Sequence, residues 1–133
     1  MRLPARGLGV LVVALAVCLL PAGCEKGPTS VKGTVLRDKK PIPVSATGVV
    51  QVTLIPDVPP GTPFTTYIGR CNPDGTFEVL GVKPGKYKVA VEQFDPSPQT
   101  DKLEGAFSAT KTTIVRDIDG KKPSEIDLAN PNG

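Results

Sequence analysis

The stretch DGTFEVLGVKPGKYKVAV, residues 74–91, gives the clearest indication of the fold. Apolar and polar residues alternate on both sides of Pro84-Gly85, and this period of two predicts strands rather than helices. Just upstream, the run Asn72-Pro73-Asp74-Gly75 predicts a hairpin between strands 65–71 and 76–80, because Pro fixes φ and Gly accepts a positive φ. Pro84-Gly85 fits a type II turn that links strand 76–80 to strand 86–92.

The same alternation recurs along the chain and predicts an all-β protein of seven strands. They are expected at 31–37, 49–55, 65–71, 76–80, 86–92, 110–116 and 125–128. The 133 residues include 15 Pro and 14 Gly, a content typical of short strands joined by turns. Each strand presents one apolar face, so two sheets can close those faces together as a sandwich.

The residues of this stretch carry a resemblance to a known family. Asp74-Gly75-Thr76-Phe77, then Gly81-Val82-Lys83-Pro84-Gly85-Lys86-Tyr87, resemble the carboxypeptidase regulatory-like domain. The opening Val31-Lys32-Gly33-Thr34-Val35 is also typical of that family. The resemblance covers residues 30–129 and implies a seven-stranded Greek-key β-sandwich of the transthyretin type. Domains of this family accompany peptidases, transporters and surface proteins as accessories, so the resemblance implies no catalytic activity.

The first 23 residues are typical of a secretory signal. Arg2 and Arg6 precede an uncharged apolar run of 13 residues, Leu8 to Leu20, which is too short to span a membrane. The following Leu20-Pro21-Ala22-Gly23-Cys24 resembles the bacterial lipobox, although Pro21 stands where an aliphatic residue is usual. In that family the Cys receives a diacylglycerol and becomes the first residue of the mature chain. The expected order is a signal peptide (1–23), a tether (24–30), the sandwich (30–129) and a tail (130–133).

This interpretation predicts a protein of the bacterial cell envelope, held by lipid on Cys24 to a membrane on its periplasmic or outer side. Ordinary secretion, with cleavage elsewhere, is the alternative. Removal of Arg2 and Arg6 lowers the formal charge from +3 to +1, so the sequence does not indicate a nucleic-acid partner. Cys71 is then a lone thiol, or it pairs with Cys24 if Cys24 is not acylated.

Candidate sites are few. The chain has no His, which excludes a Ser-His-Asp triad and imidazole-dependent metal sites. Asp117 and Asp119 precede Gly120 but lack the rest of a calcium loop, so no metal is expected, and Asp119-Gly120 is interpreted as a hairpin turn between strands 110–116 and 125–128. Asp95, Asp101 and Glu104 are interpreted as solvated loop charges. Tyr67, Phe94 and Phe107 could form an aromatic platform for a sugar or peptide.

We therefore expect a non-enzymatic protein without a cofactor, whose sandwich serves interaction or scaffolding with an unidentified envelope protein or glycan. The alternative is a carbohydrate- or peptide-binding accessory module for an envelope enzyme or transporter. Exposed aromatics near residues 94–107 would favour that alternative, and a cleft with two convergent carboxylates would favour an enzyme.

Overall fold

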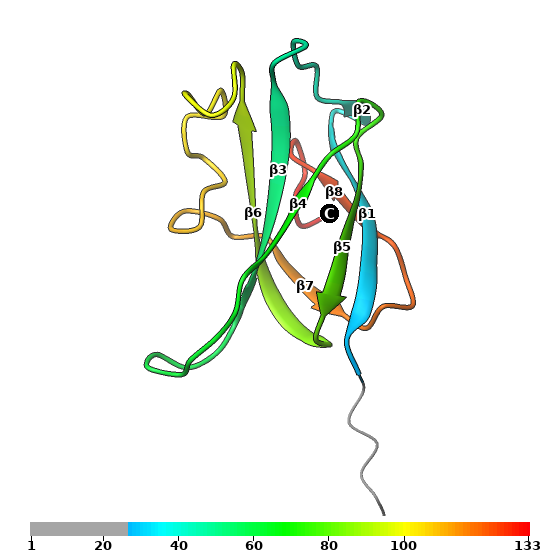
Figure 1. Ribbon diagram of the computed structural model, residues 1–133, viewed down its shortest axis with the longest axis vertical. Helices are drawn as coiled ribbons and strands as arrows, with labels where there is room; N and C mark the ends of the chain where they lie inside the picture. The colour runs from blue at the N-terminus through cyan, green and yellow to red at the C-terminus, as the bar shows by residue number, and fades with distance from the viewer. Residues whose placement is uncertain (1–26) are drawn as a thin grey trace, which may run out of the picture.

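The computed structural model describes residues 27–133, and these fold into two sheets without a helix (Figure 1). The all-β prediction is therefore confirmed. The first sheet contains β1 (Thr29–Arg37), β2 (Lys40–Pro41), β5 (Thr76–Val82) and β8 (Ser124–Asp127). The second sheet contains β3 (Val49–Pro56), β4 (Tyr67–Arg70), β6 (Gly85–Phe94) and β7 (Val115–Ile118). The predicted signal peptide and the first three residues of the predicted tether, Cys24 to Lys26, lie outside the described residues, and the tether's last two residues, Thr29 and Ser30, belong to β1.

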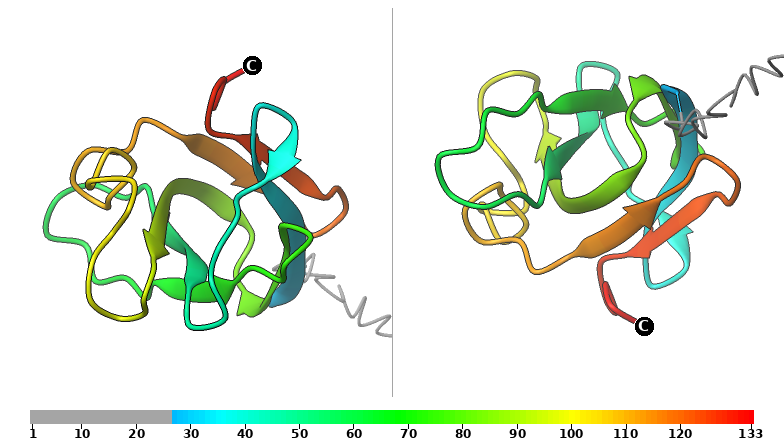
Figure 2. Two further views of the ribbon diagram at one scale, coloured as in Figure 1. Left: turned by 90° about the horizontal axis from the view of Figure 1, so that it is seen from above. Right: turned by 90° about the horizontal axis from the view of Figure 1, so that it is seen from below.

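The strand pairing is mostly antiparallel. In the first sheet β1 lies antiparallel to β2 and β5 but parallel to β8, with Gly33 opposite Ser124. The second sheet has the order β4-β3-β6-β7, and all its pairs are antiparallel. Figure 2 shows the two sheets facing each other when the molecule is seen from either end.

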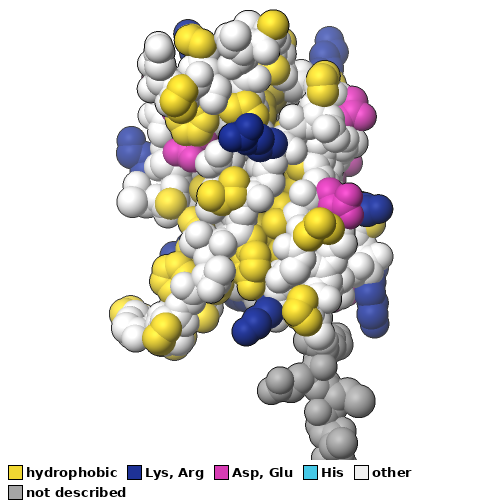
Figure 3. Space-filling model, in the orientation of Figure 1, with side chains coloured by type: hydrophobic (Ala, Val, Ile, Leu, Met, Phe, Trp, Pro, Cys, Tyr) yellow, Lys and Arg dark blue, Asp and Glu magenta, His cyan; other side chains and the backbone are white. Residues whose placement is uncertain are grey.

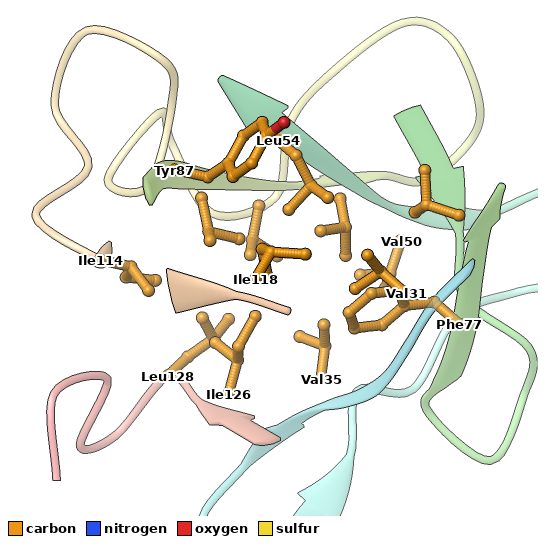
Figure 4. Packing of buried hydrophobic residues seen from close by; sticks show 14 of the residues in the cluster. Val31, Val35, Val50, Leu54, Phe77, Tyr87, Ile114, Ile118, Ile126 and Leu128 are labelled. Atoms are coloured by element: carbon orange, nitrogen blue, oxygen red, sulfur yellow. The ribbon is translucent and has the colours of Figure 1, made fainter. Parts of the chain in front are cut away.

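The alternation in the sequence places apolar side chains between the sheets. Val52 and Val91 lie opposite each other in the second sheet, and both are fully buried. Figure 4 shows Leu54 and Tyr87 facing Val35 and Ile126 across the interior. Burial of each such side chain stabilises the fold by about 1.5–3 kcal/mol. The core therefore arises from the period-two pattern itself.

The hairpin predicted at Asn72-Pro73-Asp74-Gly75 is wrong, although the turn exists. The Gly75 N–H donates to the Asn72 carbonyl at 2.9 Å, and Gly75 has φ of 85°. The strands on its two sides nevertheless join different sheets, β4 the second and β5 the first. The turn is a corner between layers, because β4 finds its partner in β3 and β5 finds its partner in β1.

Two other predicted connections also cross between the layers. Pro84-Gly85 joins β5 of the first sheet to β6 of the second, and Gly85 has φ of 157° rather than the value near +80° that a type II turn needs. Asp119-Gly120 follows β7 of the second sheet and leads to β8 of the first, so it is not a hairpin turn.

The strand predicted at 110–116 begins later than expected, at Val115. Its upstream part does contact β6, but irregularly. The Thr112 hydroxyl donates to the Val89 carbonyl at 2.6 Å, and the Val89 N–H donates to the Ile114 carbonyl at 2.9 Å. A side-chain hydroxyl thus takes the position of a backbone N–H, and the regular ladder starts only after it.

The described residues contain eight strands, and β2 was not predicted. The tight turn before β2 places Asp38 and Lys39 at φ of 51° and 62°, a conformation that usually selects Gly or Asn. Asp127, a buried residue of β8, accepts their two backbone N–H groups at 3.0 and 2.9 Å. The Asp127 carboxylate therefore stabilises a turn conformation that the residues of the turn itself do not predict.

Candidate functional site

At one end of the sandwich, the first residues of β1 and β6 lie beside the last residues of β3, β5 and β7. The strand pairs Thr29–Val82 and Gly85–Ile118 meet there, and β3 ends there at Pro56. We call this end the base; the right panel of Figure 2 shows it from below. The base is where the chain enters the fold.

Cys24, the predicted acylation site, precedes the base in the chain. The described part starts at Gly27, two residues before β1. Only Glu25 and Lys26 stand between Cys24 and Gly27. The predicted anchor is therefore attached close to the base and not to the opposite end of the sandwich.

A groove of about 340 Å³ opens at the base. It is lined by Pro56–Val58, Pro63–Thr65, Tyr67 and Lys83–Tyr87. Tyr67 and Tyr87 meet edge to face, with ring centroids 6.2 Å apart and an interplanar angle of 68°. The hydroxyl of the buried Tyr87 donates to the Lys83 carbonyl at 2.5 Å. The pKa of Tyr87 is raised, mainly by burial and to a smaller extent by the neighbouring Tyr67. The tyrosine pair therefore forms an aromatic part of the groove wall, in which the Tyr87 hydroxyl already has a hydrogen-bond partner.

The loop after β3, residues 57–66, forms the outer wall of this groove; we call it the base loop. All ten residues are exposed, and Figure 1 shows the loop projecting away from the two sheets. Its Val58 and Phe64 side chains are 37% and 55% exposed. Residues 58–66, Val-Pro-Pro-Gly-Thr-Pro-Phe-Thr-Thr, contain no charged side chain. In Figure 3 the projecting loop shows hydrophobic and uncharged atoms.

The three aromatic residues predicted as a platform are not brought together. Tyr67 pairs with Leu54 and Phe94 with Val49, so they lie about 17 Å apart along β3 at 3.4 Å per residue. Phe107 lies beside the middle of β6, where its carbonyl accepts the Val91 N–H at 2.9 Å. Tyr67 and Phe107 are half-buried against the core, and Phe94 is half-buried too.

Two of the three loop carboxylates have structural partners. Asp101 accepts the backbone N–H groups of Gln93, Leu103 and Gly105 at 2.8 to 3.0 Å, and so orders the loop after β6. Asp95 accepts two hydrogen bonds from Ser45, one from its hydroxyl and one from its backbone N–H at 2.8 Å. Both bonds lower the pKa of Asp95, and the bond from the hydroxyl has the larger effect. The prediction of solvated loop charges is thus wrong for Asp95 and Asp101. Glu104 remains exposed.

Asp117 and Asp119 lie on the chain segment that leaves β7. Asp119 accepts the Lys121 N–H at 2.8 Å across a short turn. Within residues 27–133, no three His, Cys, Asp or Glu side chains are grouped so that they could hold a metal ion.

Cys71 is a half-buried free thiol that packs against the core. Its N–H donates to the Val50 carbonyl at 2.8 Å, just beyond the end of β4. Burial, followed by the negative charge of Asp74, raises the pKa of the thiol to about 12. A thiol with so high a pKa is a poor nucleophile at neutral pH. Its pairing with Cys24 lies outside what the described residues test.

The base loop is a candidate site that the alternation of the strands does not predict. The available signal was the run of nine uncharged residues, 58–66, which contains three Pro and an aromatic residue. The exposure of Phe64 became apparent from the fold, because alternation cannot assign a face to a residue outside a strand.

Comparison with family models, with curated proteins and with solved structures found no match to this chain. Among the residues that the structure describes, no helix has the length and hydropathy needed to cross a membrane.

Proposed function

We propose that the protein is a non-enzymatic lipoprotein of the bacterial cell envelope, acylated at Cys24, whose β-sandwich serves interaction or scaffolding. One observation carries the proposal. The signal-like segment ends in Leu20-Pro21-Ala22-Gly23-Cys24, and an ordered domain begins only a few residues later. Cleavage before Cys24 would therefore leave the whole sandwich intact.

We also propose that the sandwich is a Greek-key domain of the transthyretin and carboxypeptidase regulatory-like type. The structural roles of the signature residues support this assignment. Phe77 and Tyr87 are both buried in the core, one from each sheet. At Gly75, whose φ is 85°, a Cβ would lie 2.7 Å from the Val35 carbonyl oxygen. The signature thus marks packing and turn positions rather than chemical groups.

The carboxylate geometry favours a non-catalytic role over an enzyme. Asp95 and Asp101 accept hydrogen bonds from backbone N–H groups and so hold loops in place. The bonds from Ser45 also lower the pKa of Asp95. A general acid needs a carboxyl with a raised pKa. The alternative of a carbohydrate-binding module has less support, because Phe94 and Phe107 are half-buried rather than exposed.

Detergent partitioning tests the anchor. We expect the native protein to enter the detergent-rich phase and the Cys24→Ala variant to remain in the aqueous phase. Cys71→Ala is the matched control, since it also removes one thiol and should leave partitioning unchanged. Aqueous partitioning of the native protein, or equal behaviour of Cys24→Ala and the native chain, would refute acylation at Cys24.

A further inference from the structure

The base and its loop define a surface that the proposed function does not yet explain. Four large hydrophobic side chains are exposed in residues 27–133, and two of them, Val58 and Phe64, lie on the base loop. The other two, Ile68 and Leu80, lie on β4 and β5. The base loop thus combines projection, exposed apolar side chains and, over residues 58–66, no charge at all.

The chain length before β1 places this surface near the anchor. Consecutive Cα atoms are 3.80 Å apart, so Thr29 lies at most about 19 Å from Cys24 in any conformation. The ten residues of β6 extend about 31 Å away from the base at 3.4 Å per residue. An acyl chain on Cys24 therefore keeps the base, rather than the opposite end, within reach of the bilayer surface.

From these two observations we propose that the base is a membrane-facing surface and that the base loop inserts Val58 and Phe64 into the headgroup region of the bilayer. This inference rests on the proposed acylation of Cys24. The occupant of the surface is the lipid bilayer itself. An exposed aromatic ring on an uncharged loop suits the interface, where apolar side chains leave water without the cost of burying a charge.

The charges around the base are compatible with a lipid surface but do not drive the contact. The segments that meet at the base carry four exposed lysines and three exposed carboxylates. The lysines are Lys83, Lys86, Lys121 and Lys122, and the carboxylates are Asp57, Asp117 and Asp119. The excess of one positive charge makes electrostatic attraction to anionic lipid a minor contribution. The insertion is therefore expected in neutral phosphatidylcholine vesicles as well as in vesicles that contain phosphatidylglycerol.

The absence of Trp from the chain makes a direct test possible. Phe64→Trp places a single fluorophore on the base loop. Ala46→Trp places one at an exposed turn before β3, at the opposite end of that strand from the base. Both positions are exposed, so neither change disturbs the core. Each acylated variant is reconstituted into phosphatidylcholine vesicles with and without bromine on the lipid acyl chains.

The expected result is a blue-shifted emission and quenching by brominated lipid for Phe64→Trp, and neither effect for Ala46→Trp. Adding Val58→Asp to Phe64→Trp should abolish the quenching, because insertion would then bury a charge. Absence of quenching for Phe64→Trp, or equal quenching of both tryptophans, would overturn the inference. If a protein rather than the bilayer occupies this surface, Phe64→Trp is not quenched.

The proposed acylation of Cys24 and the proposed orientation of the base toward the membrane can be refuted independently of each other. Intact mass reports acylation of the native chain, and an unmodified mass refutes the proposed function alone. In that case the Cys71→Ala chain is coupled through Cys24 to a maleimide phospholipid and the quenching is repeated. Quenching of Phe64→Trp there supports the orientation, and its absence refutes it.

Discussion

Replacement of Gly33 by Ala tests the architecture at the point where three strands meet. Gly33 lies in β1 between Phe77 of β5 and Ser124 of β8. A Cβ at this position would lie 2.3 Å from the Ser124 carbonyl oxygen and 2.6 Å from Cζ of Phe77. The phenyl ring can rotate or shift, but the Ser124 atom belongs to the backbone, so β8 must move away from β1.

The expected cost follows from these contacts. Forcing a methyl group into a packed interior costs about 1–3 kcal/mol, and a clash with backbone belongs at the upper end of that range. Ala restricts the unfolded chain more than Gly does, which offsets about 0.4–1 kcal/mol. We therefore expect the free energy of unfolding to fall by about 2 kcal/mol. For a domain of this size that lowers Tm by roughly 8–16 °C.

Thermal and urea unfolding of the mature chain, followed by far-ultraviolet circular dichroism, measure this loss. Gly27→Ala is the matched control, because a Cβ at Gly27 meets no atom within 4 Å and should leave Tm unchanged. If Gly33→Ala were as stable as the parent chain, the parallel pairing of β1 with β8 and the position of Phe77 would both be refuted.

Three further predictions concern single groups. The half-buried Cys71 thiol, with its pKa raised to about 12, should react slowly with iodoacetamide near neutral pH until urea unfolds the chain; equal rates in the two states would contradict its partial burial. Hydrogen bonds lower the pKa values of Asp74, Asp95 and Asp127 in the fold, so their contribution to stability is present above the usual carboxyl pKa near 4 and is lost as the pH falls through the lowered values. Urea midpoints that do not decrease on acidification below about pH 4 would count against this linkage. Tyr87→Phe removes one buried hydrogen bond and should lower the free energy of unfolding by about 1 kcal/mol, measured by urea titration; an unchanged midpoint would show that the bond contributes nothing.

Short-range patterns predicted the strands but not their partners. The alternation of Val50, Val52 and Leu54 correctly assigned the face that β3 buries, because side-chain direction depends only on the period of the strand. The turn at Asn72 was also recognisable. The turn fixes where the chain reverses, whereas the sheet that the next strand joins depends on packing with β1, which is distant in sequence.

The missed features depend on contacts between residues far apart in the chain. The turn at Asp38 and Lys39 adopts positive φ with the support of Asp127, 89 and 88 residues later. The Thr112 hydroxyl donates to the Val89 carbonyl, in place of a backbone hydrogen bond between the two strands. At the candidate site, Tyr67 was correctly assigned as an aromatic strand residue, but its separation from Phe94 follows from the register of β3 with its neighbours.

The mass of the N-terminal tryptic peptide of the mature protein shows whether Cys24 is acylated. Trypsin cuts after Lys26, so a chain processed before Cys24 yields Cys24-Glu25-Lys26. We expect this peptide to carry the mass of a diacylglyceryl group on the Cys24 sulfur, with or without a further acyl chain on its amino group. An unmodified Cys24, a peptide that extends upstream of Cys24, or a disulfide between Cys24 and Cys71 would contradict it.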